Sequence, residues 1–181
     1  MILALFFACA PDDVTDRKDT ADKGDDSADA DTDADADTDS DSDSDAEPRE
    51  GIDGAWVSEG DDLASLLSAE PFSYVAIHAN FGADLTYSVE ATDQDGQTGT
   101  LQGTYVASTA TTPGTITLSQ TSPYTATAQG IWQVEGTTLT YEVVQTDPDY
   151  GFTAPTPDGG FGSTSGEGLE AGVNVQVYQA E

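Results

Sequence analysis

Apolar and polar residues alternate along most of the chain from residue 54 onward. In residues 84–91, for example, Leu85, Tyr87 and Val89 fall on one face, with polar residues between them. A period of two is typical of a β-strand that buries one face. Comparable segments recur, and together they predict eight strands, at 54–58, 73–81, 84–91, 98–107, 115–121, 124–134, 137–145 and 173–179.

The connections between these segments are mostly short and rich in turn residues. Asp95-Gly96 and Glu135-Gly136 are hairpin signals, and Pro113-Gly114 and Ser122-Pro123 interrupt the strand pattern in a similar way. Because short hairpins join antiparallel neighbours, the segments predict a meander.

One stretch departs from the alternation. Leu63, Leu66 and Leu67 recur at helical spacing. Asp61 and Asp62 precede these leucines, and either can accept hydrogen bonds from the first N–H groups of a helix. We therefore predict one short helix over residues 63–69, capped by one of these aspartates.

These elements predict an all-β fold with one short helix. An antiparallel sheet of eight strands leaves two edges of unpaired backbone groups unless it closes into a barrel. We therefore predict a closed meander barrel over residues 51–181, and a two-sheet β-sandwich is the alternative.

Several glycine-aromatic motifs in residues 51–146 resemble those of bacterial lipocalin-like domains. Gly54-Ala55-Trp56 opens the first strand, and two later motifs have the same pattern, Gly103-Thr104-Tyr105 and Gly130-Ile131-Trp132. The resemblance implies a lipocalin-like barrel that holds a small apolar or amphipathic molecule. An arginine often packs on the first tryptophan of lipocalins, but no Lys or Arg follows residue 49, so we expect no such contact here.

Aromatic residues on the predicted strands are candidates to line a ligand cavity, although side chains alone can also fill a barrel of eight strands. Residues 146–172 form an unusually long connection before the last strand, and we expect Phe161 within it to pack across the barrel mouth. The candidate ligand-binding residues are Trp56, Tyr87, Tyr105, Trp132, Tyr141 and Phe161.

The charge of the chain excludes several functions. It contains 35 acidic and 4 basic residues, and all four basic residues precede residue 50. Binding to nucleic acid needs basic side chains that neutralise phosphates, so we expect no nucleic-acid partner. The lack of Lys and Arg in residues 51–181 likewise excludes phosphate clamps and Schiff-base lysines from this domain.

The sequence carries no recognisable catalytic or metal-binding motif. The single histidine, His78, is predicted on the solvent face of its strand, opposite Val75, Ile77 and Phe81. A lone histidine without cysteine or carboxylate ligands at suitable spacing is a poor zinc site. No strand–turn–helix nucleophile motif surrounds a serine. We therefore expect a protein that is not an enzyme and that holds no metal or cofactor.

The first nine residues form an apolar run that ends at Cys9, the single cysteine of the chain. Phe6-Phe7-Ala8-Cys9 resembles the cleavage site of a bacterial lipoprotein signal peptide. In that family a small residue precedes the cysteine, which is lipidated and becomes the mature N-terminus. The resemblance implies a lipid anchor at Cys9 and an outer-membrane or cell-surface location. The alternative is an apolar terminus with a buried cysteine.

Residues 10–50 predict a disordered, solvated spacer. Aspartate alternates with Ala, Thr or Ser from Asp29 onward, and Val14 is the only large apolar residue of the segment. Such a segment buries too little surface to offset its chain entropy, and its charges repel one another. A calcium loop is the alternative, but no glycine lies between Gly24 and Gly51 to turn the chain.

Together these features predict a monomeric lipoprotein of the cell envelope whose barrel binds a small apolar or amphipathic ligand. A non-enzymatic structural or protein-interaction module of the envelope is the alternative. These two functions predict different barrel interiors. Ligand binding needs a void at one end, whereas an interaction module is expected to have a filled barrel and an exposed aromatic patch.

The substitution Cys9→Ser tests the anchor. Because the serine lacks the thiol that would carry the lipid, the variant should lose acyl labelling and move from the membrane to the soluble fraction. Cell fractionation and metabolic labelling with a fatty acid measure the two effects. Unchanged labelling and membrane association would contradict a lipid anchor at this residue.

Overall fold

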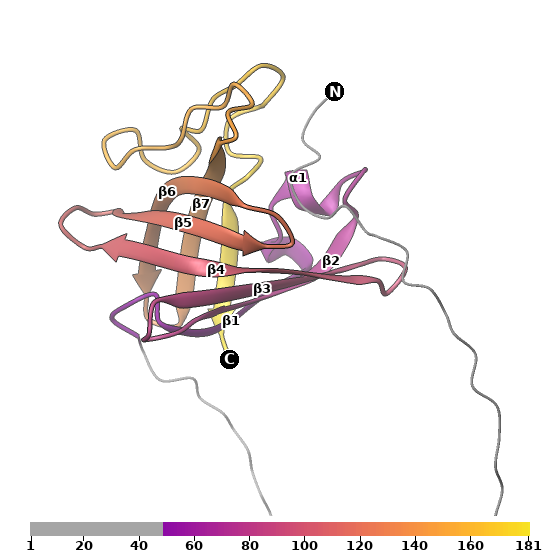
Figure 1. Cartoon of the computed structure of the whole chain (residues 1–181), viewed down its shortest axis with the longest axis horizontal. Helices are drawn as coiled ribbons and strands as arrows, with labels where there is room; N and C mark the ends of the chain where they lie inside the picture. The colour runs from indigo at the N-terminus through magenta and orange to yellow at the C-terminus, as the bar shows by residue number, and fades with distance from the viewer. Residues whose placement is uncertain (1–48) are drawn as a thin grey trace, which may run out of the picture. The chain divides into compact units, whose positions relative to one another are not determined.

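The computed structural model describes residues 49–181, which fold into a closed antiparallel barrel of eight strands (Figure 1). The strands are β1 (Gly54–Glu59), β2 (Tyr74–Phe81), β3 (Thr86–Asp93), β4 (Thr98–Ser108), β5 (Gly114–Ser122), β6 (Ala126–Glu135), β7 (Thr138–Asp147) and β8 (Gln176–Ala180). Each strand pairs with the next, and β8 closes the barrel by pairing with β1. The predicted meander barrel is therefore confirmed over the β-sandwich. Cys9 and the predicted spacer up to residue 48 lie outside the described residues.

The glycines of two glycine-aromatic motifs keep neighbouring strands close together. A Cβ atom at Gly130 on β6 would lie 1.9 Å from the carbonyl oxygen of Glu142 on β7. A Cβ atom at Gly103 on β4 would lie 2.1 Å from the carbonyl oxygen of Ser119 on β5. Any larger residue would push the strands apart at these points. The aromatic residue two positions after each glycine is buried in the core.

The connection between β1 and β2 differs from the predicted capped helix. It contains a 3-10 turn, η1 (Gly60–Asp62), and a single α-helical turn, α1 (Ser65–Ser68). Neither Asp61 nor Asp62 caps α1, whose N-cap is Ala64, so the capping prediction was wrong. The Ala64 N–H donates instead to the Gln176 side chain on β8 at 2.8 Å. A tertiary hydrogen bond therefore takes the place of the expected cap.

Two apolar residues assigned to the buried face are exposed. Leu85 lies in the β2–β3 turn with a φ of 66° and is 51 % exposed, because β3 begins one residue later. Val75 is 48 % exposed because a register shift between Tyr74 and Ala76 leaves it outside the ladder. The prediction that these two side chains face the core was wrong, since a turn and a bulge shift the phase of the alternation.

The connections divide the barrel into two ends. At what we call the open end lie the β1–β2 connection, the β3–β4 turn and the β7–β8 loop (residues 148–175). At the closed end lie residues 49–53 and the turns at 82–85 and 136–137. Figure 1 shows the β7–β8 loop and α1 toward the top and the C-terminus at the bottom.

Aromatic side chains fill the closed end. The Phe81 ring packs edge-on against Tyr105, with ring centroids 5.2 Å apart, and stacks with Tyr87 at 6.4 Å. Trp56 is completely buried, and Trp132 is almost so. These rings contribute much of the apolar area that stabilises the fold, and their packing makes this end of the barrel solid.

Arg49 packs on Trp56 at the closed end. Its guanidinium carbon lies 4.9 Å from the centre of the indole ring. The guanidinium donates hydrogen bonds to the carbonyl oxygens of Asp53 and Glu181, both at 3.0 Å. Gly54 leaves room for it, since a Cβ atom there would lie 1.3 Å from Nη1. The expectation that no arginine contacts this tryptophan was therefore wrong, because the arginine precedes the first strand, within the predicted spacer.

The substitution Arg49→Ala should destabilise the barrel by about 2 kcal/mol, because it removes a cation–π contact and two charged hydrogen bonds. Urea titration followed by tryptophan fluorescence measures the loss. Arg17→Ala is the matched control, since it removes the same charge at a position that precedes the described residues. Equal midpoints for the two variants would mean that the Arg49 contacts contribute nothing.

Candidate functional site

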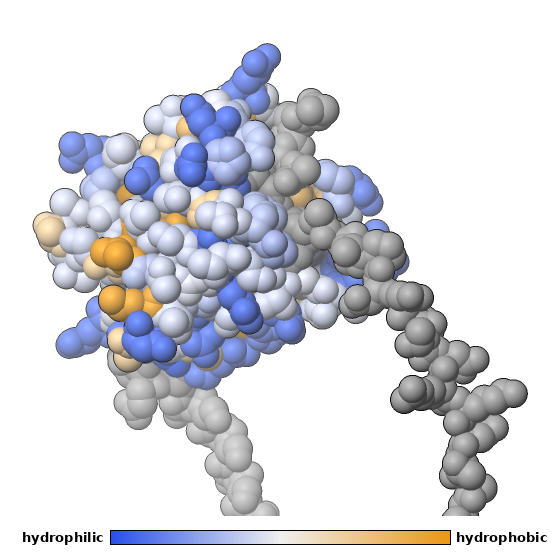
Figure 2. All heavy atoms as spheres, in the orientation of Figure 1, coloured by the Kyte–Doolittle hydropathy of each residue, from blue (hydrophilic) through white to orange (hydrophobic). Residues whose placement is uncertain are grey.

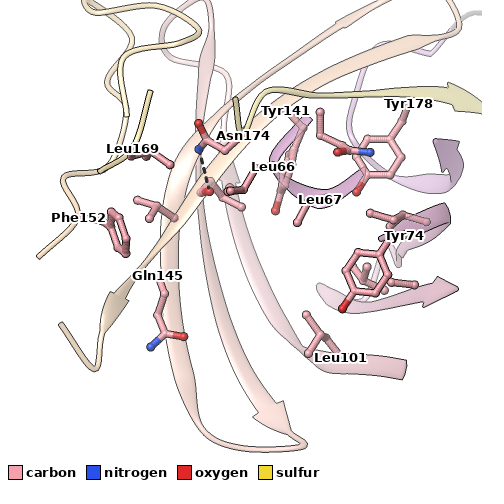
Figure 3. A pocket seen from close by; sticks show the side chains of 16 residues that line it. Leu66, Leu67, Tyr74, Leu101, Tyr141, Gln145, Phe152, Leu169, Asn174 and Tyr178 are labelled. Carbon is pink, nitrogen blue, oxygen red and sulfur yellow. Dashed lines mark hydrogen bonds between the residues drawn. The ribbon is translucent and has the colours of Figure 1, made fainter. Parts of the chain in front are cut away.

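An apolar cavity of about 110 Å³ lies at the open end of the barrel (Figure 3). None of the side chains that line it is charged, and most are aliphatic or aromatic. The lining residues are Leu66, Leu67, Tyr74, Ile77, Val89, Ala91, Leu101, Tyr141, Val143, Val144, Gln145, Phe152, Leu169, Asn174, Gln176 and Tyr178.

Aliphatic side chains form much of the cavity wall on β2, β3 and β4. Ile77, Val89, Ala91 and Leu101 point inward from β2, β3 and β4, where the closed end has tryptophan, tyrosine and phenylalanine. Because these residues are smaller than the rings below them, the side chains do not fill the interior at this end. The void therefore arises from the choice of inward residues along the strands.

Two tyrosines lie between the cavity and the packed closed end. The rings of Tyr141 on β7 and Tyr178 on β8 meet edge to face with centroids 6.2 Å apart, and Tyr141 also packs on Phe81 at 6.1 Å. Burial raises the pKa of Tyr141 well above its usual value, and burial also raises the pKa of Tyr178. Both hydroxyls are therefore protonated at neutral pH and able to donate a hydrogen bond.

The β7–β8 loop supplies the outer wall of the cavity. Figure 3 shows Phe152 and Leu169 from the loop on one side, with Tyr74 and Tyr178 on the other. The Phe152 ring packs tightly on Gly166, where a Cβ atom would lie 2.3 Å from a ring carbon. The position of the loop therefore determines how far the cavity is covered.

Glu142 holds the β7–β8 loop against the barrel. Its side chain is completely buried. Its neighbours in the sequence, Tyr141 and Val143, both line the cavity. One carboxylate oxygen accepts a hydrogen bond from the Gly162 N–H at 2.6 Å, and the other accepts one from the Thr164 N–H at 3.0 Å. The buried charge is stabilised by these two loop N–H groups, so the loop conformation and the carboxylate depend on each other.

Asn174 adds a second connection between the loop and the barrel. Its side-chain amide donates to the Thr164 hydroxyl at 3.1 Å and to the Val143 carbonyl oxygen at 3.4 Å. Its Oδ1 atom is buried without a hydrogen-bond partner. Such an acceptor costs about 1–3 kcal/mol, and exposure to water would recover that energy. The contacts of Asn174 therefore stabilise the loop by less than their number suggests.

One of the six predicted ligand-binding residues lines the cavity, and that residue is Tyr141. Trp56, Tyr87, Tyr105 and Trp132 are buried in the closed end, where the structure brings them together as packing residues. Phe161 is half-buried in the β7–β8 loop but is not among the lining residues.

Three of the four packed aromatic residues form side-chain hydrogen bonds within the closed end. The indole N–H of Trp56 donates to the Ile52 carbonyl oxygen at 2.7 Å, and that of Trp132 donates to the Thr115 carbonyl oxygen at 3.1 Å. The Tyr105 hydroxyl donates to the Asp53 carboxylate. Burial raises the pKa of Tyr87 to about 12, so this hydroxyl also stays neutral. None of these groups points to a role in binding a ligand.

A signal for the missed residues is present in the sequence. In a meander the strands alternate in direction, so the start of one strand lies beside the end of the next. Tyr74 at the start of β2 and Ala91 near the end of β3 therefore belong to the same end of the barrel as Gln176 at the start of β8. Sorting the inward residues by barrel end would have separated them from the closed-end aromatics.

His78 is 47 % exposed, as predicted, and its Nδ1 lies 3.0 Å from a carboxylate oxygen of Glu181. Within residues 49–181 no group of three or more His, Cys, Asp or Glu side chains is arranged to hold a metal ion. The same residues contain no helix with the length and apolar character needed to cross a membrane.

Comparison with known proteins gives no relative for this chain: no family model matches it, and no curated protein or solved structure is significantly similar.

The substitution Glu142→Gln should loosen the β7–β8 loop. The amide retains one acceptor oxygen but turns an NH2 group toward a loop N–H, so one hydrogen bond is lost at a cost of about 2 kcal/mol. We expect faster hydrogen exchange at the amides of Gly162 and Thr164. Glu90→Gln, at an exposed position on β3, is the control. Identical exchange in the two variants would contradict an anchoring role for Glu142.

Proposed function

We propose that the barrel binds a small apolar or amphipathic molecule in the cavity at its open end. The observation that carries this proposal is the contrast between the two ends. The closed end is filled with aromatic rings, while the open end keeps an apolar void covered by the β7–β8 loop. A void at one end is the feature expected of a ligand-binding barrel rather than of an interaction module.

The cavity dimensions limit the size of the molecule. Apolar cavities of roughly 150 Å³ stay dry and take up benzene-sized molecules, whereas sites for drug-sized ligands are about 300–1,000 Å³. A cavity of about 110 Å³ therefore suits a single ring or a short alkyl chain. The protonated hydroxyls of Tyr141 and Tyr178 are available for one polar group, and outward movement of the loop would admit a longer chain.

The proposal places this barrel in the bacterial cell envelope, as a monomer anchored through a lipid at Cys9. This location is proposed because residues 6–9 resemble the cleavage site of a lipoprotein signal peptide and an aspartate-rich sequence follows them. A cell-surface position would expose the barrel to molecules outside the cell. The substitution of Cys9 described above tests this part independently of the cavity.

Filling the cavity tests the binding role. Ala91 lines the cavity and is 3 % exposed, so Ala91→Phe should place a ring in the void. We expect the affinity for toluene, a neutral apolar molecule with a single ring, to fall at least about tenfold in calorimetric titration, or ~1.4 kcal/mol. Ala110→Phe makes the same change at an exposed position in the β4–β5 turn and should leave binding unaltered.

A melting curve for each variant separates loss of binding from loss of folding, because overpacking costs about 1–3 kcal/mol. Equal probe affinity in folded Ala91→Phe, Ala110→Phe and the native protein would contradict binding in this cavity.

A further inference from the structure

The acidic residues of the barrel domain are concentrated at the open end. Residues 51–181 contain 17 acidic residues, and eleven of them fall in the segments that surround the cavity. Four lie in residues 59–70, two in residues 93–95 and five in residues 147–170. Hydrophilic side chains gather over the β7–β8 loop in Figure 2, in the upper part of the view. The apolar cavity therefore opens within an acidic rim, the name we give to these three segments.

Several rim residues lie directly beside the cavity lining. Glu170 follows Leu169, which lines the cavity, and Glu167 follows Gly166, on which the Phe152 ring packs. Asp93 is the strand partner of Tyr74, another lining residue. A ligand that buries an apolar group in the cavity would therefore hold its other end close to carboxylates.

Basic side chains of the described residues lie elsewhere. Arg49 is at the closed end, where Trp56 and two carbonyl oxygens engage it. His78 faces Glu181, which follows β8 at the same end. Within residues 49–181, no Lys or Arg therefore offsets the charge of the rim.

We infer that the preferred ligand of the cavity is a cationic amphiphile: a short alkyl or aromatic group that fills the cavity, joined to an ammonium group at the acidic rim. This inference rests on the proposed function of the cavity and defines the ligand class. The cavity holds no charged side chain, so a charged head group stays at the rim. There it is attracted if positive and repelled if negative.

The attraction is electrostatic and partly exposed to solvent, so salt weakens it. The Debye length is about 30 Å at 0.01 M ionic strength and about 8 Å at 0.15 M, which limits the number of rim carboxylates that one head group senses. The apolar part of binding does not weaken with salt in this way. Salt dependence therefore separates the contribution of the rim from that of the cavity.

Three probes with the same chain and different head groups test the inference on the full-length protein. Butyltrimethylammonium, butanol and butanoate are titrated calorimetrically at 0.02 M and 0.5 M sodium chloride. At low salt we expect the ammonium probe to bind roughly tenfold more tightly than butanol, with butanoate the weakest, and the spread to shrink at high salt.

Outcomes of this titration separate the two proposals. Equal affinity for all three probes at low salt would overturn the cationic preference while leaving cavity binding intact. No binding of any probe would overturn the cavity function itself. Ammonium binding that survives Ala91→Phe would come from the aspartate-rich segment instead and would also overturn the inference.

Matched sets of charge variants locate the effect. Changing Glu59, Glu167 and Glu170 to Gln removes three exposed carboxylates from the rim. Changing Glu50, Glu90 and Glu135 to Gln removes the same charge elsewhere on the barrel. We expect the ammonium probe to lose about fivefold in affinity with the first set and little with the second. Equal losses would mean that net charge, not the rim, attracts the probe.

Discussion

Closure of the sheet is the constraint on which the rest of the structure depends. The closing pair is short, with Trp56 opposite Ala180 and Val57 opposite Gln179. Arg49 reinforces this seam between β1 and β8 by donating hydrogen bonds to a carbonyl oxygen just before β1 and to another just after β8. A domain whose residues 51–181 contain no Lys or Arg therefore depends on backbone pairing, and its seam is supported by one arginine from just before that range.

The division of the interior follows from this closure. Large rings packed together make the closed end rigid, so the inward residues at the other end can be small without collapse of the barrel. Tyr141 marks the boundary, since its ring touches Phe81 in the packed end and also lines the cavity. Stability and binding capacity are thus assigned to opposite ends of the same strands.

Alternation along the sequence was sufficient to predict the strands and their order, because each strand buries one face. It failed at Leu85 and Val75, where a turn and a bulge change the phase over one or two residues. The sequence analysis also missed Arg49, because this residue precedes residue 51, where the change in composition was taken as the start of the domain. Phe152 rather than Phe161 lines the cavity, because the backbone of the loop decides which ring faces it, and contacts with β7 determine that backbone.

The buried carboxylate of Glu142 has a consequence for how this protein can diversify. It depends on main-chain N–H groups, which every residue except proline possesses, rather than on particular side chains. The segment it holds includes Gly160 and Gly162, with φ angles of 69° and 85°. Mutational drift in the loop should therefore be limited by backbone shape at these glycines, while the neighbouring exposed side chains remain free to change. Such a loop can acquire new recognition residues without losing its attachment to the barrel.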